Sequence, residues 1–453
     1  MTAWLKLRIL VLLTLLGSAG GAWSADTLKW NVAADRVDAT INGWTVPELL
    51  EQVATATGWQ IFLDPEITNR IPAKFTDKPP GEALRRLLGE YNYALVPATG
   101  SPARLFVFRK SREQATRAIQ PVVAKKTAKG RIPNELIVTL KPGEKIEDIA
   151  KRLGAKVMGR SEGQDTYRLR LEDEKATQTA RADLQTDPAV ESIDNNYTVS
   201  RPDATQALGT PGGPLPLRPQ ASPDGKYTVI GLIDSAVQPK DGNFADFVLP
   251  GISVQGDGTA SASGPTHGTS MSETILRALS AGSADGLTTV RILPVDVYGA
   301  NAATTTYDIA VGIYKAVNAG AMIVNLSLGG EGDSTYLHDT IRSAHDQGVL
   351  FIGAAGNEPV TTATYPAAYP EVIAVTASDA SGALAPYANR GDFIDVMAPG
   401  GSLITFRGQQ FFVTGTSAAT AFVTGRAAGQ VERTGRTPAA VEAVIRQSRS
   451  PKN

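Results

Sequence analysis

Two stretches between residues 25 and 110 carry apolar side chains at helical spacing. The first begins after Thr45, whose hydroxyl can cap a helix N-terminus, and stops at Gly58, a residue type that commonly ends helices. The second covers residues 81–91. Each is followed by a short apolar run that is typical of a strand. The repetition predicts a small α+β domain of the βαββαβ type over residues 25–110.

Residues 111–131 contain six Lys and Arg and lack apolar periodicity, so we expect a basic linker there. Regular patterns return over residues 132–200, where they predict a second βαββαβ domain. Its elements are expected at 134–140, 146–153, 166–171, 175–184 and 190–199. The Pro and Gly residues of 201–226 then predict a second linker.

Residues 227–453 alternate apolar strands with helices, which is the pattern of a largely parallel sheet covered by helices on both faces. We therefore expect an α/β fold, a doubly wound mostly parallel sheet, preceded by the two small α+β domains. Such sheets bind their ligands beyond the carboxyl ends of the strands. Polar side chains that directly follow these strands are the first candidates for chemistry.

The composition limits the number of domains and the possible classes of protein, but it does not identify the function. A chain of 453 residues with 42% hydrophobic and 20% charged residues has the length for two to four domains. The net charge of -1 gives no electrostatic footprint for nucleic acid, which we exclude as a partner. The absence of cysteine excludes disulfides, thiolate metal sites and cysteine nucleophiles.

The N-terminus has the pattern of an export signal. Lys6 and Arg8 precede an apolar run over residues 9–16, and small residues follow up to Ser24. We expect residues 1–24 to be a signal peptide that is cleaved after Ser24. The alternative is a membrane anchor, but the apolar run is shorter than the roughly 20 residues that a membrane span needs. The expected location is outside the cytoplasm, in the periplasm rather than the medium.

An acidic residue and a histidine stand where the sheet is expected to hold its site. Asp234 follows the apolar strand of residues 228–233 directly, and His267 opens a helical pattern. The two other histidines, His338 and His345, lie in a polar helical segment and are expected at the surface. Each of these features is common by itself, because acidic residues after strands are often helix caps or loop residues.

A serine and an asparagine complete the set. Ser417 lies in a Gly-flanked turn that enters an Ala-rich helix, where free amides and the helix dipole favour negative charge. Asn357 lies in the stretch of residues 350–358, which is expected to be a buried strand ending in small residues, and its carboxamide can donate a hydrogen bond to a developing oxyanion. As isolated signals, the serine is more often a cap and the asparagine a turn residue.

The order Asp, His, Asn, Ser resembles that of the subtilisin-like serine peptidases, the subtilases. The resemblance covers about residues 227–448, through VIGLIDSAV, HGTSMSETI, AMIVNLSLGG, FIGAAGNEP, YPAAYPEVIAVTA and GTSAATAFVTG. It implies that Ser417 is the nucleophile, His267 the base, Asp234 the group that orients the imidazole and Asn357 an oxyanion donor. It implies a polypeptide substrate in extended conformation, bound by Ser327, Leu328 and Gly329, with Ala354, Ala355 and Gly356 as the second wall of the pocket.

Three positions depart from the subtilase pattern. Ala236 stands where the family usually has glycine, Ala421 where it usually has proline, and HGTSM replaces the more frequent HGTHV. None of these changes removes a catalytic atom, but each can alter loop geometry. The small residues around the expected pocket predict a moderately large apolar substrate side chain.

The two N-terminal domains have resemblances of their own. ELIVTLKPG and VESIDNNY in residues 132–200 resemble subtilisin propeptides, which implies an intramolecular inhibitor whose tail lies in the active site. VPELLEQVATATGWQIFLD and EALRRLLGEYNYALV resemble the short N-terminal domain of secretins and TonB-linked receptors. The second resemblance implies that residues 25–110 dock to an envelope protein; a plain spacer domain is the alternative.

The function expected from the residues and the resemblance is that of a serine endopeptidase acting outside the cytoplasm. One rival is a subtilisin-fold scaffold that has lost efficient cleavage, and another is an esterase using the same three groups. No cofactor is expected to be required. Calcium often supports the subtilase family, but no oxygen-rich loop identifies its ligands.

Overall fold

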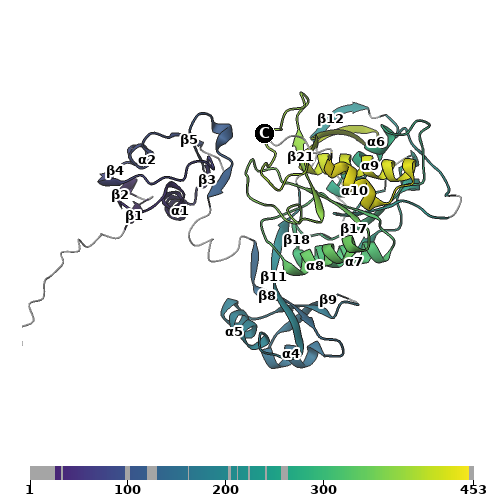
Figure 1. Cartoon of the computed structure of the whole chain (residues 1–453), viewed down its shortest axis with the longest axis horizontal. Coiled ribbons are helices and arrows are strands. Elements are labelled where there is room, and N and C mark those ends of the chain that lie inside the picture. Colours follow the sequence, from purple (N-terminus) through teal and green to yellow (C-terminus); the bar gives the residue numbers. More distant parts are fainter. Residues whose placement is uncertain are drawn as a thin grey trace, which may run out of the picture.

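The computed structural model describes residues 26–447, apart from 32–33, 97–102, 120–129, 162, 203–205, 212, 223–224, 240–241 and 257–263 (Figure 1). The expected signal peptide, residues 1–24, lies outside this part of the chain. Within the described residues, no helix combines the length and apolarity that a membrane span requires. Figure 1 shows three bodies, two small ones and a large C-terminal one. Backbone hydrogen bonds link the large body to both of the small ones.

The first body confirms the two helices predicted from spacing. Thr45 accepts a hydrogen bond from the Glu48 amide while the Glu48 side chain bonds the Thr45 amide, so a capping box starts the first helix. Gly58 ends it in the left-handed conformation. The helices are α1 (Val46–Thr57) and α2 (Pro80–Leu88). They pack with two sheets, ordered β1-β2-β4 and β5-β6-β3-β7, so the element order is richer than βαββαβ. The first sheet comprises β1 (Thr27–Asn31), β2 (Arg36–Ile41) and β4 (Ala73–Lys78), and the second contains β3 (Gln60–Leu63), β5 (Asn92–Val96) and β6 (Arg104–Phe108).

The boundary expected at residue 110 is wrong, because the first domain continues to residue 119. After the short helix η1 (Arg112–Gln114), the strand β7 (Arg117–Ile119) pairs antiparallel with β3. Of the six basic residues that suggested a linker, Arg117 lies on this edge strand, whose Ile119 is buried in the domain core. Lys125, Lys126 and Lys129 lie outside the described residues. The same edge contacts the third body, where the Thr361 amide donates to the Thr116 carbonyl at 2.7 Å.

The second body has the predicted βαββαβ order. Its elements are β8 (Arg131–Leu140), α4 (Ile146–Leu153), β9 (Lys156–Ser161), β10 (Thr166–Arg170), α5 (Glu174–Leu184) and β11 (Val190–Ser200). The sheet order is β18-β11-β8-β10-β9, and β18 (Ala303–Thr305) belongs to the third body. The last strand of this domain therefore crosses into the third body as part of a shared sheet.

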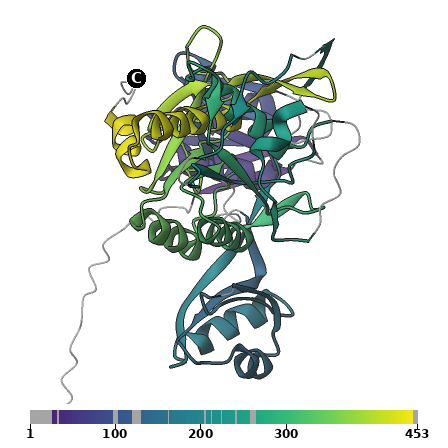
Figure 2. The same ribbon diagram turned by 90° about the vertical axis from the view of Figure 1, so that its right-hand side faces the viewer.

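The third body is built on a seven-stranded parallel sheet, as predicted. The strand order is β15-β17-β14-β19-β20-β21-β22. Side chains of β14 alternate between two cores: Ile230 and Leu232 face α6 and α9, whereas Val229 and Ile233 face α7 and α8. Figure 2 shows the two helix layers on opposite sides of this sheet. The strands are β14 (Val229–Asp234), β15 (Ile252–Ser253), β17 (Arg291–Asp296), β19 (Ile323–Leu326), β20 (Leu350–Ala354), β21 (Val372–Ser378) and β22 (Val396–Pro399). The helices are η2 (Gly242–Phe247), α6 (His267–Ser280), α7 (Thr306–Asn318), α8 (Thr335–Asp346), α9 (Thr416–Thr434) and α10 (Pro438–Gln447).

The segment expected as a linker, residues 201–226, is partly ordered into strands. The strand β12 (Gln206–Pro211) joins β24 (Gln409–Thr414), which pairs with β23 (Gly401–Phe406). The strand β13 (Arg218–Pro219) pairs with β16 (Leu287–Thr288). The proline and glycine residues of this segment argue against strands, so the pairings were not predicted. Both strands form because they pair with edge strands of the third body, which lie far away in the sequence.

The second domain docks through buried polar groups at the N-termini of α7 and α8. Arg168 on β10 forms a buried ion pair with Asp308 in the first turn of α7, at 2.9 Å. Asp194 on β11 accepts from the Ser334 hydroxyl at 2.7 Å and from the Tyr336 amide at 3.0 Å. Burial raises the pKa of Asp194 and that of Asp308, and for Asp308 the Arg168 charge opposes the increase. The interface therefore depends on buried carboxylates, and removing their partners should lower the stability of the folded chain.

Replacing Arg168 with Met should lower the free energy of unfolding by about 3–5 kcal/mol near neutral pH, because it leaves the buried Asp308 carboxylate unpaired. The control is Arg160→Met, which breaks the exposed pair with Glu147 and should cause a much smaller loss. Since burial raises the folded-state pKa of Asp308, protonation relieves the defect, which should shrink as the pH falls through that raised pKa. Denaturant unfolding of both variants at pH 8 and pH 5 measures this, and equal losses for the two would contradict it.

Candidate active site

A carboxylate and an imidazole meet at the end of β14. Asp234 is the last residue of the strand and is 1% exposed. Its two carboxylate oxygens lie 2.9 and 2.8 Å from Nδ1 of His267. The amide of Ser235 donates a further hydrogen bond to Oδ1 at 2.7 Å. The carboxylate therefore holds one ring nitrogen, which leaves Nε2 as the atom available for proton transfer.

The backbone around His267 allows this approach only because residue 268 is glycine. Thr266 caps α6 by accepting from the Thr269 amide, so His267 projects from the first turn. A Cβ on Gly268 would overlap the carbonyl oxygen of Ser235. The Gly268 amide instead donates to the Ser235 hydroxyl at 3.0 Å. Ser235, which was not predicted, thus ties the end of β14 to the start of α6.

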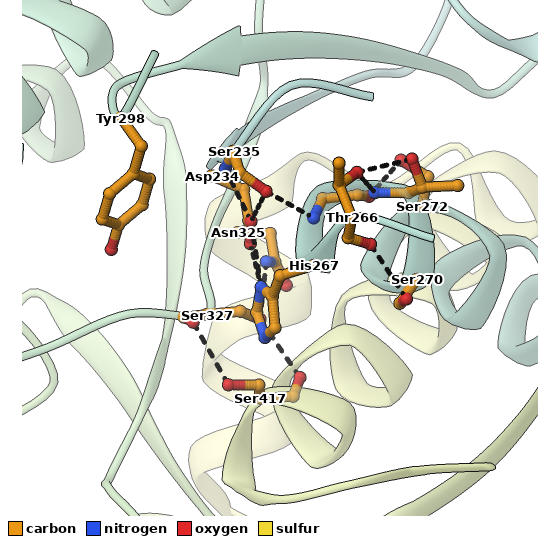
Figure 3. A network of polar contacts seen from close by, with 12 residues as sticks. Asp234, Ser235, Thr266, His267, Ser270, Ser272, Tyr298, Asn325, Ser327 and Ser417 are labelled. Atoms are coloured by element: carbon orange, nitrogen blue, oxygen red, sulfur yellow. Dashed lines mark hydrogen bonds and ion pairs between the residues drawn. The ribbon is translucent and has the colours of Figure 1, made fainter. Parts of the chain in front are cut away.

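Ser417 lies in the first turn of α9, at the opposite side of the imidazole from Asp234 (Figure 3). Gly415 precedes the helix with a φ of 138°, a conformation that side-chain-bearing residues rarely adopt. The Ser417 hydroxyl donates to the Ser327 carbonyl at 3.1 Å and the residue is 6% exposed. His267 and Ser417 line the same cavity, so the three predicted groups are brought together.

A polar network behind Ser417 was missed by the sequence analysis. The Ser327 hydroxyl donates to the Ser417 carbonyl at 3.1 Å and receives a hydrogen bond from Nδ2 of Asn325 at 2.9 Å. Asn325 Oδ1 accepts from the Thr424 hydroxyl on α9 at 2.9 Å. All of these side chains are buried. The network fastens the start of α9 to the end of β19, and a buried asparagine in a strand was the signal that could have revealed it.

Asn357 is oriented by the start of the same helix. Its Oδ1 accepts from the Thr416 amide at 2.8 Å and from the Thr416 hydroxyl at 3.0 Å. Both hydrogen bonds use the carboxamide oxygen, so Nδ2 is the atom that is left to donate to another group. A Cβ on Gly415 would lie 3.1 Å from this Nδ2, so the glycine also leaves room for the amide. The amide of Ser417 belongs to the first turn of α9, where amides have no partner within the helix.

The cavity at the site is about 660 Å³ and contains most of the predicted wall. Its lining includes Ser327, Leu328 and Gly329 on one side, together with Ala354, Gly356 and Asn357 on the other. Ala355 does not line it: this residue is fully buried, and its amide donates to the Val375 carbonyl at 3.0 Å within the sheet. The expectation for Ala355 as a wall residue is therefore corrected, because the strand alternates its faces at that point.

The tail of the second domain enters the cavity. Ser200, Arg201 and Pro202 are among its lining residues. The Arg201 amide donates to the Ala302 carbonyl at 2.9 Å, which extends the pairing of β11 with β18. The hydroxyl of the buried Tyr298 donates to the Ser200 carbonyl at 3.2 Å, and burial raises the pKa of Tyr298 well above its usual value, so this group stays a donor. The chain thus holds its own segment against the site as an extended strand.

The two other histidines each pair with a single acidic side chain. His338 pairs with Glu371 at 2.9 Å and His345 with Glu442 at 3.0 Å, both away from the cavity. Among the residues that the structure describes, no group of three or more His, Asp or Glu side chains is placed to hold a metal ion. We therefore assign no calcium ligands in this chain.

A parallel sheet whose carboxyl edge brings an Asp–His pair near a serine in the first turn of a helix defines a class: α/β proteins built like serine hydrolases. Comparison with family models narrows the class. The model of the subtilase family matches residues 186–452, more than half of the chain, and that of the fervidolysin N-terminal prodomain matches residues 118–196. The chain belongs to the subtilase family, and its second domain is a fervidolysin-like prodomain.

Individual relatives cover parts of the chain. The minor extracellular protease Epr of Bacillus subtilis is 28% identical over 267 residues, which are 54% of this chain and 40% of that protein. The thermophilic serine proteinase of Bacillus sp. strain AK1 is 39% identical over 132 residues, 29% of this chain and 33% of the relative. The chain thus spans well under half of the length of these two relatives.

Two solved structures share the fold. Fervidolysin from Fervidobacterium pennivorans aligns with a TM-score of 0.55 at 20% identity, covering 67% of this chain and 55% of that one. The epidermin leader peptide processing serine protease of Staphylococcus aureus aligns with a TM-score of 0.53 at 15% identity, covering 69% and 92%. At these identities the similarity establishes the fold alone.

Replacing Gly268 with Ala should lower the free energy of unfolding by about 2–3 kcal/mol, because the new methyl group forces the start of α6 away from the Ser235 carbonyl. Gly81→Ala is the matched control: Gly81 is also the second residue of a helix, and nothing lies within 4 Å of a Cβ built there. The control should be neutral or stabilising by up to about 1 kcal/mol. Denaturant unfolding compares the two, and similar values would refute the close-approach argument.

Proposed function

We propose that this chain is a serine endopeptidase that cuts extended polypeptide segments through an acyl-enzyme. The observation that carries the proposal is the alignment of Asp234, His267 and Ser417 around one cavity, with the Asp234 carboxylate 2.8 Å from His267 Nδ1. Four segments far apart in the chain supply these groups and Asn357. Their convergence at the carboxyl edge of the sheet supports chemistry rather than a structural role.

The proposed reaction uses groups of the chain itself. The Ser417 oxygen attacks the substrate carbonyl carbon while its proton passes to Nε2 of His267, and Asp234 stabilises the imidazolium that forms. The carbon–nitrogen bond then breaks, and the imidazolium gives its proton to the leaving amine. Water repeats the sequence on the acyl-enzyme: its proton goes to Nε2, and the carbon–oxygen bond to Ser417 breaks with return of that proton. Before the first step, the hydroxyl must leave the Ser327 carbonyl that it contacts in the uncut chain.

Negative charge on the former carbonyl oxygen needs donors that are already in place. Nδ2 of Asn357 and the amide of Ser417 are proposed for this task. Their arrangement is supported by the hydrogen bonds that fix Oδ1 of Asn357 to Thr416, which leave Nδ2 to face the cavity. The start of α9 adds its partial positive charge to the same position.

The prodomain tail supports the proposed substrate conformation. Residues 198–200 run antiparallel to β18, and the next amide continues the same ladder. An extended substrate can pair with this edge through main-chain hydrogen bonds in the same way. In the uncut chain the tail occupies that place, so we propose that access to the site requires its displacement.

Two other functions use the same geometry. An esterase would act through the same three groups, but the strand-pairing edge at β18 favours a peptide substrate. A catalytically inactive scaffold would have no need for the hydrogen bonds that orient His267 and Asn357. Both alternatives are separated from the peptidase by measuring covalent labelling and peptide hydrolysis in the same preparation.

Ser417→Ala should abolish fluorophosphonate labelling and cleavage of an unfolded protein, because it removes the attacking oxygen. Asp234→Asn should retain the fold but lower kcat about 10⁴-fold, since an amide no longer selects the ring tautomer with Nε2 free. Labelling is followed on gels and cleavage by mass spectrometry, after the wild-type chain has completed any processing of its own. Labelling without peptide cleavage would point to the esterase, and an unlabelled wild type to the scaffold.

Asn357→Leu should lower kcat about 10²- to 10³-fold with little change in KM, because it removes a donor that acts mainly in the transition state. The control is Asn301→Leu, which removes a carboxamide that donates to the Tyr298 carbonyl at 3.1 Å in the turn before β18 and does not line the cavity. Steady-state kinetics on a fluorogenic peptide measure both variants. A loss confined to KM for Asn357→Leu would argue against an oxyanion role.

We also propose that the chain is exported and that its first domain docks to a protein of the cell envelope. The signal-like N-terminus and the pattern of residues 25–110 support this proposal. The edge strand β5 exposes Leu95 and Val96, which gives the first domain an apolar edge to which a partner strand can be added. The periplasm fits these features better than the medium.

A further inference from the structure

The first domain has a second apolar face, on the side of its β5-β6-β3-β7 sheet that is turned away from the domain core. Side chains of these strands alternate between the two faces, and Ile61 and Leu63 lie in the core. Phe62, between them, is in register with Phe106 on β6 and with Ala118 on β7. The rings of Phe62 and Phe106 stack with their centroids 5.1 Å apart. A folded first domain without a neighbour would therefore expose two aromatic rings on one surface.

A loop of the third body covers this aromatic face. The loop, residues 358–361, follows Asn357 directly, and its Val360 forms one apolar cluster with Phe62 and Ala115. In the folded chain Val360 is 4% exposed and Phe62 is 7% exposed. Separating the two bodies would return these side chains to water, which costs free energy in proportion to the apolar area exposed. The contact should therefore persist while both bodies are folded.

Backbone hydrogen bonds hold the same loop on two sides. On the first-domain side, the Thr361 amide donates to the Thr116 carbonyl at 2.7 Å. On the other side, the Arg390 amide donates to the Val360 carbonyl at 3.0 Å. The Arg390 guanidinium also reaches the first domain, where its Nη1 donates to the Glu113 carbonyl at 3.3 Å. The loop thus lies between the first domain and a segment of its own body, and the first domain supplies the acceptor for one of its amides.

The position of this loop bears on the proposed oxyanion donor. Val360 lies three residues after Asn357, and its amide donates to the Glu358 carbonyl, which closes a tight turn just after Asn357. The Asn357 carboxamide is oriented from the other side by the hydrogen bonds from Thr416 to Oδ1. A shift of the turn would therefore move the Asn357 backbone relative to this fixed contact and change the direction of Nδ2. An oxyanion donor is effective only when its position is closely held.

From these contacts we infer that the first domain is part of the active peptidase. It stays on the third body, where Phe62 and Ala115 act as positioning residues that hold the 358–361 loop and, through it, Asn357. The inference rests on the proposed peptidase activity. It uses the β7 side of the sheet, whereas the envelope partner is proposed at β5, the opposite edge. The two roles of the first domain therefore do not compete for one surface.

Capture of active molecules shows whether the first domain stays with them. A biotin-linked fluorophosphonate labels molecules whose Ser417 is a reactive nucleophile, and streptavidin then collects them without denaturant. Mass spectrometry should recover peptides from residues 26–119 in the wild-type captures, whatever cuts the chain has undergone. Captures that contain the third body without these peptides would overturn the inference.

Weakening the cluster should slow turnover. Phe62→Asp places a carboxylate against Val360, and Ala115→Asp does so from the connection between η1 and β7, outside the sheet. Each variant should lower kcat about threefold to tenfold and change KM by less than about twofold, because the loop acts on a group used mainly in the transition state. Steady-state kinetics on a fluorogenic peptide measure both, and a wild-type kcat in both variants would refute the positioning role.

Two controls separate loss of the contact from general damage. Phe62→Leu keeps an apolar side chain in the cluster and should retain kcat within about twofold of the wild-type value. Tyr227→Asp makes the same change from aromatic ring to carboxylate at a residue that is 37% exposed and precedes β14, at the opposite end of that strand from Asp234. It should leave kcat unchanged, and a loss as large as that of Phe62→Asp would contradict the inference. Melting curves check that each variant is folded.

A double variant tests the route through Asn357. If the loop acts through this carboxamide, adding Phe62→Asp to Asn357→Leu should cause no further loss of kcat. A defect that is merely structural would multiply the two losses, and that result would argue against positioning.

Failure of this inference is distinguishable from failure of the proposed function. If Ser417 is labelled and peptide is cut, but the first-domain variants behave as wild type, the peptidase stands and the positioning role falls. If the wild-type chain is neither labelled nor able to cut peptide, the proposed function itself is wrong.

Discussion

The Asp234 carboxylate, buried at the carboxyl end of a central strand, is the constraint on which the site depends. A charge at this depth is stable only with partners, and the partners come from the start of α6: His267 bonds it directly and Ser235 links it to the Gly268 amide. The same pairing brings α6 to within van der Waals reach of β14. The same hydrogen bonds therefore satisfy the buried Asp234 carboxylate and orient the His267 ring.

The start of α9 is held by a separate polar network. Asn325, Ser327 and Thr424 tie the helix to β19, while Thr416 ties it to Asn357. Ser417 thus lies on a helix whose first turn is anchored on both sides. Because Asn325, Ser327, Thr416 and Thr424 are buried and hydrogen-bonded to one another or to Asn357, the position of the Ser417 backbone is set before any substrate arrives. Only the hydroxyl has to reorient.

The prodomain docks through charged side chains, and its tail is held in the cavity through backbone pairing. Arg168 and Asp194 meet the N-terminal turns of α7 and α8, whereas residues 198–201 extend along β18 into the catalytic cavity. The two contacts are distinct in kind: the first involves charged side chains of the prodomain, and the second involves main-chain groups that any extended peptide offers.

Much of this architecture follows from local sequence, because periodicity and capping act within a few residues. The spacing after Thr45, the βαββαβ order of the prodomain and the alternation of β14 between two cores all follow from such patterns, and the ordered motifs around Asp234, His267, Asn357 and Ser417 indicated the site. Tertiary structure decided what depends on residues far apart in the chain. The strand β7 and the strand β12 form only by pairing with distant edges, and the buried state of Ala355 follows from its place in the sheet. Asn389 lies against Gly356 only in the folded chain, and no local pattern marks this contact between residues 33 positions apart.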